Sequence, residues 1–132
     1  MTQEMILLQS LSFLGICKRA GRVTSGSDAV IEEIRNDRAE LVLLDEAASD
    51  NAKKRIRDAC RSHQTELYVL PEGKIGHAIG QDDRMAVCLS QDRMTRKLQS
   101  LLTQYRALNT ESSPIESGYS DSNQCGGKEV DD

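Results

Sequence analysis

Aromatic residues are scarce in this sequence, which has no Trp, one Phe and three Tyr among its 132 residues. Proteins that bind single-stranded nucleic acids stack the bases on exposed aromatic side chains. Because we expect Phe13 and Tyr68 in the core, few such platforms remain, and this mode of binding is disfavoured. The chain also has no apolar run near the roughly 18 residues that a membrane-spanning helix needs. Met5-Ile6-Leu7-Leu8 follows an acid and does not resemble a signal peptide, so we expect a cytoplasmic protein without a membrane partner.

The four cysteines are widely spaced and form no CxxC pair: Cys17, Cys60, Cys88 and Cys125. Three of them lie in apolar patterns typical of buried thiols, so a disulfide framework is not expected. Cys60 and His63 are separated by two residues, but no second pair has the spacing of a zinc site. No cysteine lies in a motif that supplies a base, and no carboxylates are evidently paired. The sequence therefore predicts neither a metal nor catalysis.

Charge divides the chain into two parts. Residues 1–106 contain 16 Lys and Arg against 15 Asp and Glu, whereas residues 107–132 contain one Lys against six acids. The overall charge of −4 therefore combines a body near +1 with a tail of −5. Because the tail is also rich in Ser and Gly, we expect one folded domain over residues 1–106 and a disordered tail over residues 107–132.

Helix and strand patterns alternate through the predicted domain. Leu7, Leu11 and Leu14 recur at helical spacing, whereas Leu41-Val42-Leu43-Leu44 is a continuous run that suits a central strand buried on both faces. Helices are expected over residues 5–20, from residue 26, from about residue 49, over residues 72–80 and from Ser90. Strands are expected over residues 41–44, 67–70 and 85–89, and a short extended segment is expected at residues 22–24. This order predicts an α/β fold, a three-layer α/β/α sandwich around a small sheet.

The segment from Lys18 to Asp28 combines cations, glycines and a helix start. Ser25 or Ser27 is expected to cap the helix that begins near Gly26, whose first N–H groups and partial positive charge suit an anion. Lys18, Arg19 and Arg22 are expected to add positive potential there. The glycine spacing matches a P-loop, but Ser27 occupies the lysine position and the segment follows a helix, which disfavours nucleotide hydrolysis. A plain connecting turn is the alternative.

Two further segments each have a functional and a structural interpretation. Five cations lie around the third helix, which is either a phosphate-binding face or a solvated face partly neutralised by Asp50 and Asp58: Lys53, Lys54, Arg55, Arg57 and Arg61. Gly76 and Gly80 interrupt the next helix, and each glycine costs about 1 kcal/mol relative to Ala. Their absent side chains make room either for RNA or for a tight contact of the helix with the sheet.

In order and spacing, several motifs resemble the L7Ae/L30e/S12e/Gadd45-type ribosomal-protein family, and its bacterial YlxQ-type members in particular. They are Gly26-Ser27-Asp28, Ala39-Glu40-Leu41-Val42-Leu43-Leu44, Asn51-Ala52-Lys53-Lys54 and Ile75-Gly76-His77-Ala78-Ile79-Gly80. The similarity runs from about Leu7 to Leu102. It implies an L30e-like sandwich around a small mixed four-stranded sheet that binds kinked RNA, often a kink-turn, without a cofactor.

The resemblance assigns Gly26 to the helix start, where the RNA approaches the backbone. Asp28 and Ala29 occupy positions where kink-turn binders commonly have Asn and Glu. An aspartate has no donor and an alanine no acceptor, which favours phosphate contacts over base-edge contacts. The predicted RNA-binding residues are Lys18, Arg19, Arg22, Ser25, Gly26, Ser27, Asp28, Lys53, Lys54, Arg57, Gly76 and Arg84.

Two functions follow as hypotheses. The first is a non-catalytic RNA-binding protein of ribosomal type that recognises structured RNA, ribosomal or ribosome-associated, by its shape and phosphates. The second is a protein-interaction, ribosome-assembly or regulatory module that uses the same fold without direct contact with RNA. The acidic tail and the Asp28-Ala29 pair favour the second, in which other ribosomal or assembly proteins are the partners.

Overall fold

Five helices and four strands alternate along the chain in the computed structural model, which describes residues 2–108. The helices are α1 (Gln3–Arg19), α2 (Ser27–Arg35), α3 (Asp50–His63), α4 (Lys74–Ile79) and α5 (Arg93–Leu108). The strands are β1 (Val23–Ser25), β2 (Leu41–Asp45), β3 (Glu66–Leu70) and β4 (Ala86–Leu89).

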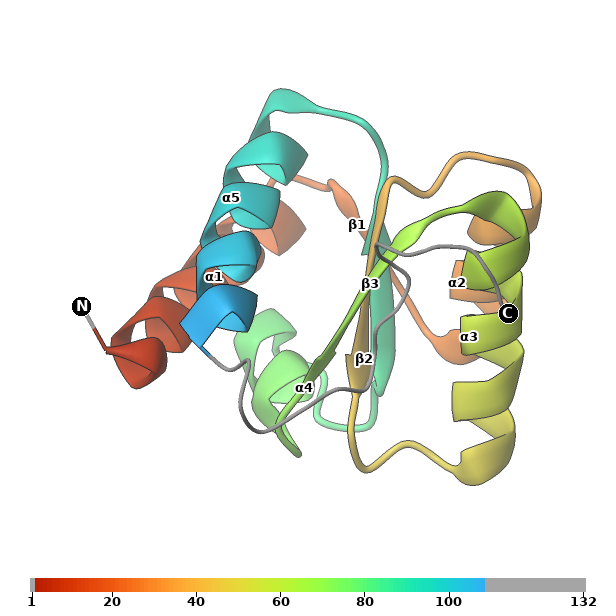
Figure 1. Cartoon of the computed structure of the whole chain (residues 1–132), viewed down its shortest axis with the longest axis horizontal. Helices are drawn as coiled ribbons and strands as arrows, with labels where there is room; N and C mark the ends of the chain where they lie inside the picture. Colours follow the sequence, from red (N-terminus) through yellow and green to blue (C-terminus); the bar gives the residue numbers. More distant parts are fainter. Residues whose placement is uncertain (1, 109–132) are drawn as a thin grey trace.

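The elements form three layers with the sheet in the middle. Figure 1 shows α1, α4 and α5 on one face of the sheet and α2 and α3 on the other. The predicted α/β/α sandwich is therefore confirmed. The strand order is β1-β4-β2-β3, in which β2 and β3 are parallel while β4 runs antiparallel to both β1 and β2. The sheet is thus four-stranded and mixed, as the family resemblance implies.

Strand β2 supplies side chains to both halves of the core. All five of its residues are buried, because β4 and β3 flank it and helices cover both of its faces. Leu41 and Leu43 pack towards α1, α4 and α5, whereas Val42 and Leu44 pack towards α2 and α3. Burial of one such side chain contributes about 1.5–3 kcal/mol, so this run anchors the sheet between its two helical layers.

The bounds of the first and last helices of the chain differ from the predicted ones. Helix α1 begins at Gln3, two residues before the predicted start, because the Thr2 hydroxyl accepts a hydrogen bond from Met5 N at 3.2 Å and caps the helix. Helix α5 begins at Arg93 rather than at Ser90, whose carbonyl accepts instead from the Thr95 hydroxyl at 2.6 Å. It ends at Leu108, two residues past the predicted domain boundary, and the predicted disordered tail lies outside the described residues beyond that point.

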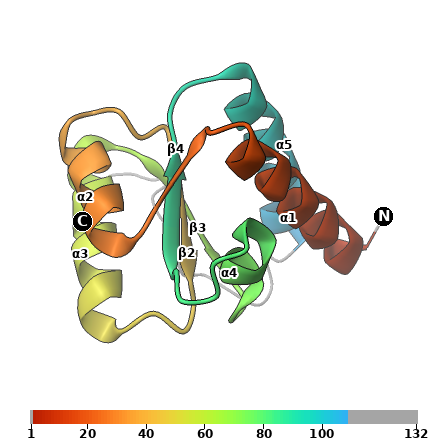
Figure 2. The same cartoon turned by 180° about the vertical axis from the view of Figure 1, so that it is seen from behind.

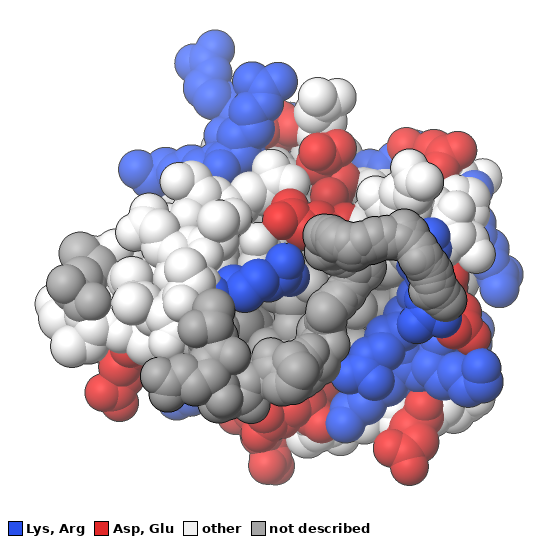
Figure 3. Space-filling view, in the orientation of Figure 1, with Lys and Arg blue, Asp and Glu red and all other residues white. Residues whose placement is uncertain are grey.

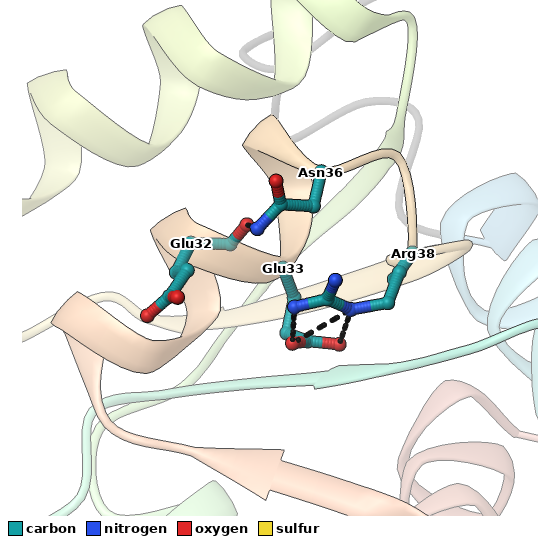
Figure 4. Close-up of polar contacts among 4 residues, drawn as sticks. All are labelled: Glu32, Glu33, Asn36 and Arg38. Carbon is teal, nitrogen blue, oxygen red and sulfur yellow. Dashed lines mark hydrogen bonds and ion pairs between the residues drawn. The ribbon is translucent and has the colours of Figure 1, made fainter.

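Two side chains that follow α2 contact residues of its last turns. Figure 4 shows Asn36 Nδ2 donating to the Glu32 carbonyl, at 3.0 Å, and Arg38 held against the carboxylate of Glu33. The shortest contact of that ion pair, from Arg38 Nη2 to Glu33 Oε2, is 2.7 Å. These contacts accompany a left-handed residue, Asp37, with a φ of 58°. Arg38 is therefore engaged within the protein.

None of the helices within residues 2–108 combines the length and the apolar character that crossing a membrane requires.

Candidate functional site

Four connections gather at one edge of the sheet. The strand pairing places the ends of β1, β2 and β3 beside the start of β4. Residues 26–27, 46–49, 71–73 and 80–85 therefore lie along this edge, which we call the junction edge, and α2 and α3 both begin there. Figure 2 shows the β1–α2 connection and the loop before β4 at this end of the molecule.

Gly26 forms the junction between β1 and α2. It is the N-cap residue of α2, its backbone has a φ of 102° and a ψ of 136°, and no side chain caps the helix. Its N–H donates to the Ala86 carbonyl and its carbonyl accepts from Val30 N, both at 2.9 Å. The prediction that Ser25 or Ser27 caps this helix is wrong. Without a capping side chain, the first N–H groups of α2 remain available to an external acceptor.

Ser25 is directed to the neighbouring loop instead. It is the last residue of β1, paired with Val87, and its hydroxyl donates to Gln81 Oε1 at 3.1 Å. Ser27 is the first residue of α2. The Ser25–Gln81 contact ties the β1–α2 junction to the loop before β4, and no sequence pattern indicates it because 56 residues separate the two partners.

Arg84 lies against the junction from that same loop. A Cβ built on Gly26 comes within 3.0 Å of Arg84 Nη1. Arg84 is half-buried, and among the described residues its buried Nε has no hydrogen-bond partner. The guanidinium and the start of α2 therefore combine a fixed positive charge with uncapped backbone donors. This is a pairing that suits an anion with several acceptor oxygens.

Helix α3 adds cations beside this junction, and Figure 3 shows a gathering of Lys and Arg where Figure 1 places α3. Arg55 Nη2 lies 3.3 Å from Asp28 Oδ1, and Lys54 Nζ lies 3.0 Å from Asp58 Oδ2. Of the two acids expected to neutralise this helix, Asp58 contacts Lys54 and also Arg61, whereas Asp50 forms no ion pair within residues 2–108. Lys53 and Arg57 likewise form no ion pair in this part of the chain, so their charges are not offset there.

The cations that precede the junction in sequence lie elsewhere. Lys18 and Arg19 occupy the last turn of α1, and Arg22 comes just before β1. Because β1 runs from Val23, opposite Leu89, to Ser25, opposite Val87, Arg22 and Gly26 flank opposite ends of that strand. Arg22 Nε instead lies 3.8 Å from Asp92 Oδ2. These three cations therefore lie at the opposite end of β1 from the Gly26 junction and not beside it, as their closeness in sequence suggested.

Gly76 makes room for the protein's own backbone. Helix α4 is shorter than predicted, Lys74–Ile79, and Gly76 is buried within it. A Cβ on Gly76 would come within 2.9 Å of the Gln81 carbonyl oxygen and 3.0 Å of Asp82 Cα. Of the two alternatives for this glycine, close packing is observed, although the neighbour is the loop that bears Arg84 rather than the sheet. The predicted contact between Gly76 and RNA has no support from this position.

Asp45 holds two connections of the junction edge in place. Its carboxylate is buried, with one oxygen accepting from Ala47 N at 2.7 Å and the other from Gly73 N at 2.8 Å. The loops after β2 and β3 are thereby joined through one side chain. The helix and strand patterns do not indicate this role for Asp45, although an acid that directly continues a fully buried run is a signal for it.

The described residues hold no metal-binding group of three or more His, Cys, Asp or Glu. The junction edge offers a cation, Arg84, together with backbone donors and hydroxyls, and such groups bind anions. It also carries four exposed carboxylates that oppose an anion: Glu46, Glu72, Asp82 and Asp83.

Comparison with known proteins identifies the family. The model of the ribosomal protein L7Ae/L30e/S12e/Gadd45 family matches residues 10–98, well over half of the chain. The chain belongs to this family. The matched range runs from α1 to the middle of α5 and includes the whole junction edge.

Two curated relatives of this chain have the same name as each other. The RNA-binding protein YlxQ of Bacillus subtilis (strain 168) is 43% identical over 90 residues, which cover 67% of this chain and 90% of that protein. The RNA-binding protein YlxQ of Enterococcus faecium is 30% identical over 74 residues, covering 55% and 72% respectively. The predicted resemblance to YlxQ-type members is thus confirmed, and both names describe RNA binding rather than a catalysed reaction.

Solved structures agree on the L7Ae/L30e-type fold. A protein with unknown function from Bacillus halodurans C has a TM-score of 0.66 and 30% identity, and the match covers 71% of this chain and 96% of that one. The 15.5kD RNA binding protein of Giardia lamblia has a TM-score of 0.64, with coverages of 79% and 90%. At 14% identity, the second match speaks for the fold alone.

Proposed function

We propose that this protein binds structured RNA at the junction edge and acts without catalysis. The observation that carries the proposal is the Gly26 junction, where a helix start without a capping side chain lies beside the Arg84 guanidinium. Membership of a family whose curated members include RNA-binding proteins supports the same function. Location in the cytoplasm and association with ribosomal RNA or ribosome-associated RNA belong to this proposal.

Phosphate contacts provide most of the affinity in this proposal. Arg84, Lys53 and Arg57 supply positive charge, and the first N–H groups of α2 supply backbone donors. Asp28 opposes an approaching phosphate, but Arg55 offsets its charge at 3.3 Å. Single-strand stacking is disfavoured because Tyr68 is buried and Phe13 packs against the core.

The shape of the RNA provides the selectivity. Four connections form a continuous edge rather than a narrow slot, so an RNA whose backbone bends around that edge makes more contacts than a straight duplex. A kink-turn has such a bend. We therefore propose a kinked or looped RNA as the ligand, recognised by its shape and phosphates rather than through base edges read by Asp28 and Ala29.

The proposal is tested by titrating the full chain with a kink-turn RNA and with a straight duplex of equal length, at several salt concentrations. We expect tighter binding of the kinked RNA and a linear fall of log K with log salt. In Arg84→Gln, we expect the slope to decrease by up to about 0.9, the value for one phosphate contact. Arg38→Gln is the matched control, since it removes one charge that Glu33 already engages at the end of α2. Equal binding of both RNAs, or equal effects of the two variants, would refute the proposal.

An exposed apolar stripe favours the protein-interaction module as a second candidate. Met5, Leu8 and Ile16 on α1 are 51%, 59% and 43% exposed. A ribosomal or assembly protein covering them would bury this surface. Affinity purification of the tagged chain, with and without nuclease, separates the two functions: partners held through RNA are lost after digestion, whereas directly bound proteins remain.

A further inference from the structure

A second group of cations lies where α1 ends and α5 begins. We call it the α1–α5 pole, and it consists of Lys18, Arg19, Arg22, Arg93, Arg96 and Lys97. Figure 3 shows Lys and Arg side chains gathered at the upper left, where Figure 1 places the start of α5. Helices α1 and α5 pack against each other, and Lys97 Nζ lies 5.7 Å from the centre of the Phe13 ring of α1.

The charges of this pole are largely unbalanced. Among the residues that the structure describes, Arg22 is its only member with an ion-pair partner, Asp92, and that contact is long at 3.8 Å. On α3, by contrast, Lys54, Arg55 and Arg61 all have carboxylate partners. The pole therefore keeps most of the positive potential that its six cations produce.

Three of these cations stand at the unfavourable end of their helix. Arg93, Arg96 and Lys97 fall within the first five residues of α5, and the first turn contains no acid. The positive end of the helix dipole repels them, so this arrangement opposes folding. No contact within the described residues compensates for Arg93 or Arg96. Asp92, the residue just before the helix, offsets part of this repulsion. A cluster of cations that keeps an excess of charge at this position indicates binding of an anionic partner.

We propose that the α1–α5 pole binds the phosphate backbone of an RNA duplex that flanks the segment held at the junction edge. The inference rests on the proposed function and adds a second contact surface to it. Strand β4 separates the two surfaces: Arg84 precedes it and Ser90 follows it, so six residues of extended chain span about 20 Å. With the rise of about 2.8 Å per base pair of an A-form helix, the RNA must continue for about seven pairs beyond the junction edge to reach the pole.

The composition of the pole fits a duplex backbone. Four of its six cations are arginines, whose planar guanidinium binds phosphate through two hydrogen bonds. Within residues 2–108, Phe13 is the aromatic ring that contacts the pole, and it is partly buried beneath Lys97 and packs against the core. The pole therefore contacts phosphates without reading sequence.

The test compares two RNAs and three proteins, all as full chains. One RNA carries a kink-turn with a flanking helix of three base pairs, and the other has the same kink-turn with a flanking helix of twelve. The proteins are the unchanged chain, the pole variant Arg93→Gln/Arg96→Gln/Lys97→Gln, and the control variant Arg35→Gln/Arg38→Gln/Arg61→Gln. The control loses the same charge from the α2–α3 layer.

We expect the unchanged chain to bind the long RNA more tightly than the short one and with a steeper salt dependence. The pole variant should bind the short RNA normally, but it should lose about tenfold or more in affinity for the long RNA, with a slope reduced by about 2–3. Its urea midpoint should equal or exceed that of the unchanged chain, because the repulsion at the start of α5 is relieved. The control variant should keep the preference for the long RNA.

Two negative results are distinguishable. If the unchanged chain binds neither RNA, the proposed function fails and this inference fails with it. If it binds both and the pole variant retains the full affinity and slope for the long RNA, or if the control variant loses as much, the inference alone is overturned.

Discussion

Replacement of Gly26 by Ala tests the backbone geometry on which the junction depends. A φ of 102° with a ψ of 136° is a conformation that residues with a side chain rarely adopt. Holding Ala there costs about 1–3 kcal/mol of folding free energy. Ala also restricts the unfolded chain, which returns about 0.4–1 kcal/mol. We therefore expect Gly26→Ala to lower the free energy of unfolding by about 1–2 kcal/mol.

The contact with Arg84 adds little to this loss. The new Cβ would lie 3.0 Å from Nη1 and 4.0 Å from Cζ, which are at the far end of a flexible side chain. Moving that end to another rotamer costs at most about 0.5–1.5 kcal/mol. A double-mutant cycle with Arg84→Ala separates the two terms, because the variant Gly26→Ala/Arg84→Ala keeps the backbone strain and removes the contact. We expect most of the loss to persist in the double variant.

Urea unfolding followed by far-ultraviolet circular dichroism is the appropriate assay, since the chain has no Trp. Gly80→Ala is the matched control: its φ of 75° and ψ of 20° are left-handed helical, and nothing lies within 4 Å of its Cβ position. Non-glycine residues already occupy that region at Asp37 and Gln64, so this variant should lose less. A Gly26→Ala protein as stable as the parent, or less affected than Gly80→Ala, would refute the reasoning.

Three further predictions concern other parts of the fold. Gly76→Ala should lower the free energy of unfolding by about 1–3 kcal/mol in the same assay, because the new Cβ would meet the backbone of the loop that bears Arg84. The same change should weaken RNA binding. A variant with unchanged stability would contradict this close packing. The hydrogen-bonded ion pair with Arg38 lowers the pKa of Glu33. This carboxylate therefore stabilises the fold when the pH is above its ordinary pKa, and the stabilisation is lost as the pH falls through the lowered pKa. Titration followed by NMR should show that pKa returning to its usual range in Arg38→Gln, and an unchanged pKa would refute the assignment. Burial raises the pKa of the Cys60 thiol, and it raises the pKa of the Cys88 thiol to about 12. Iodoacetamide at pH 8 should therefore modify neither thiol until urea unfolds the chain, which mass spectrometry would show.

Sequence patterns predicted the layers of this fold because the periods of its apolar residues are clear. The run from Leu41 to Leu44 has no polar interruption, and it is the strand that helices cover on both faces. The repeat of Leu7, Leu11 and Leu14 likewise identified α1. Helix ends were less predictable, since they depend on single hydrogen bonds such as the one from Met5 N to Thr2.

The candidate site was only partly predictable, because it is assembled from segments distant in sequence. Lys18, Arg19 and Arg22 are close to Gly26 along the chain, yet a strand of three residues carries them to the other end of the sheet. Arg84 is 58 residues from Gly26 in sequence and lies against it in the fold. Proximity in sequence is therefore a poor guide to a site made of loops that meet only once the sheet has formed.

The buried carboxylate of Asp45 links two loops of the junction edge, so that they move together. It accepts one amide from the connection after β2 and one from the connection after β3, so neither loop is free to shift without the other. Removing this carboxylate would take away the partner of two part-buried amides, and each lost hydrogen bond costs about 0.5–1.5 kcal/mol. An insertion in either loop, during evolution or in protein engineering, is therefore tolerated only where it keeps both amides in reach of the same side chain.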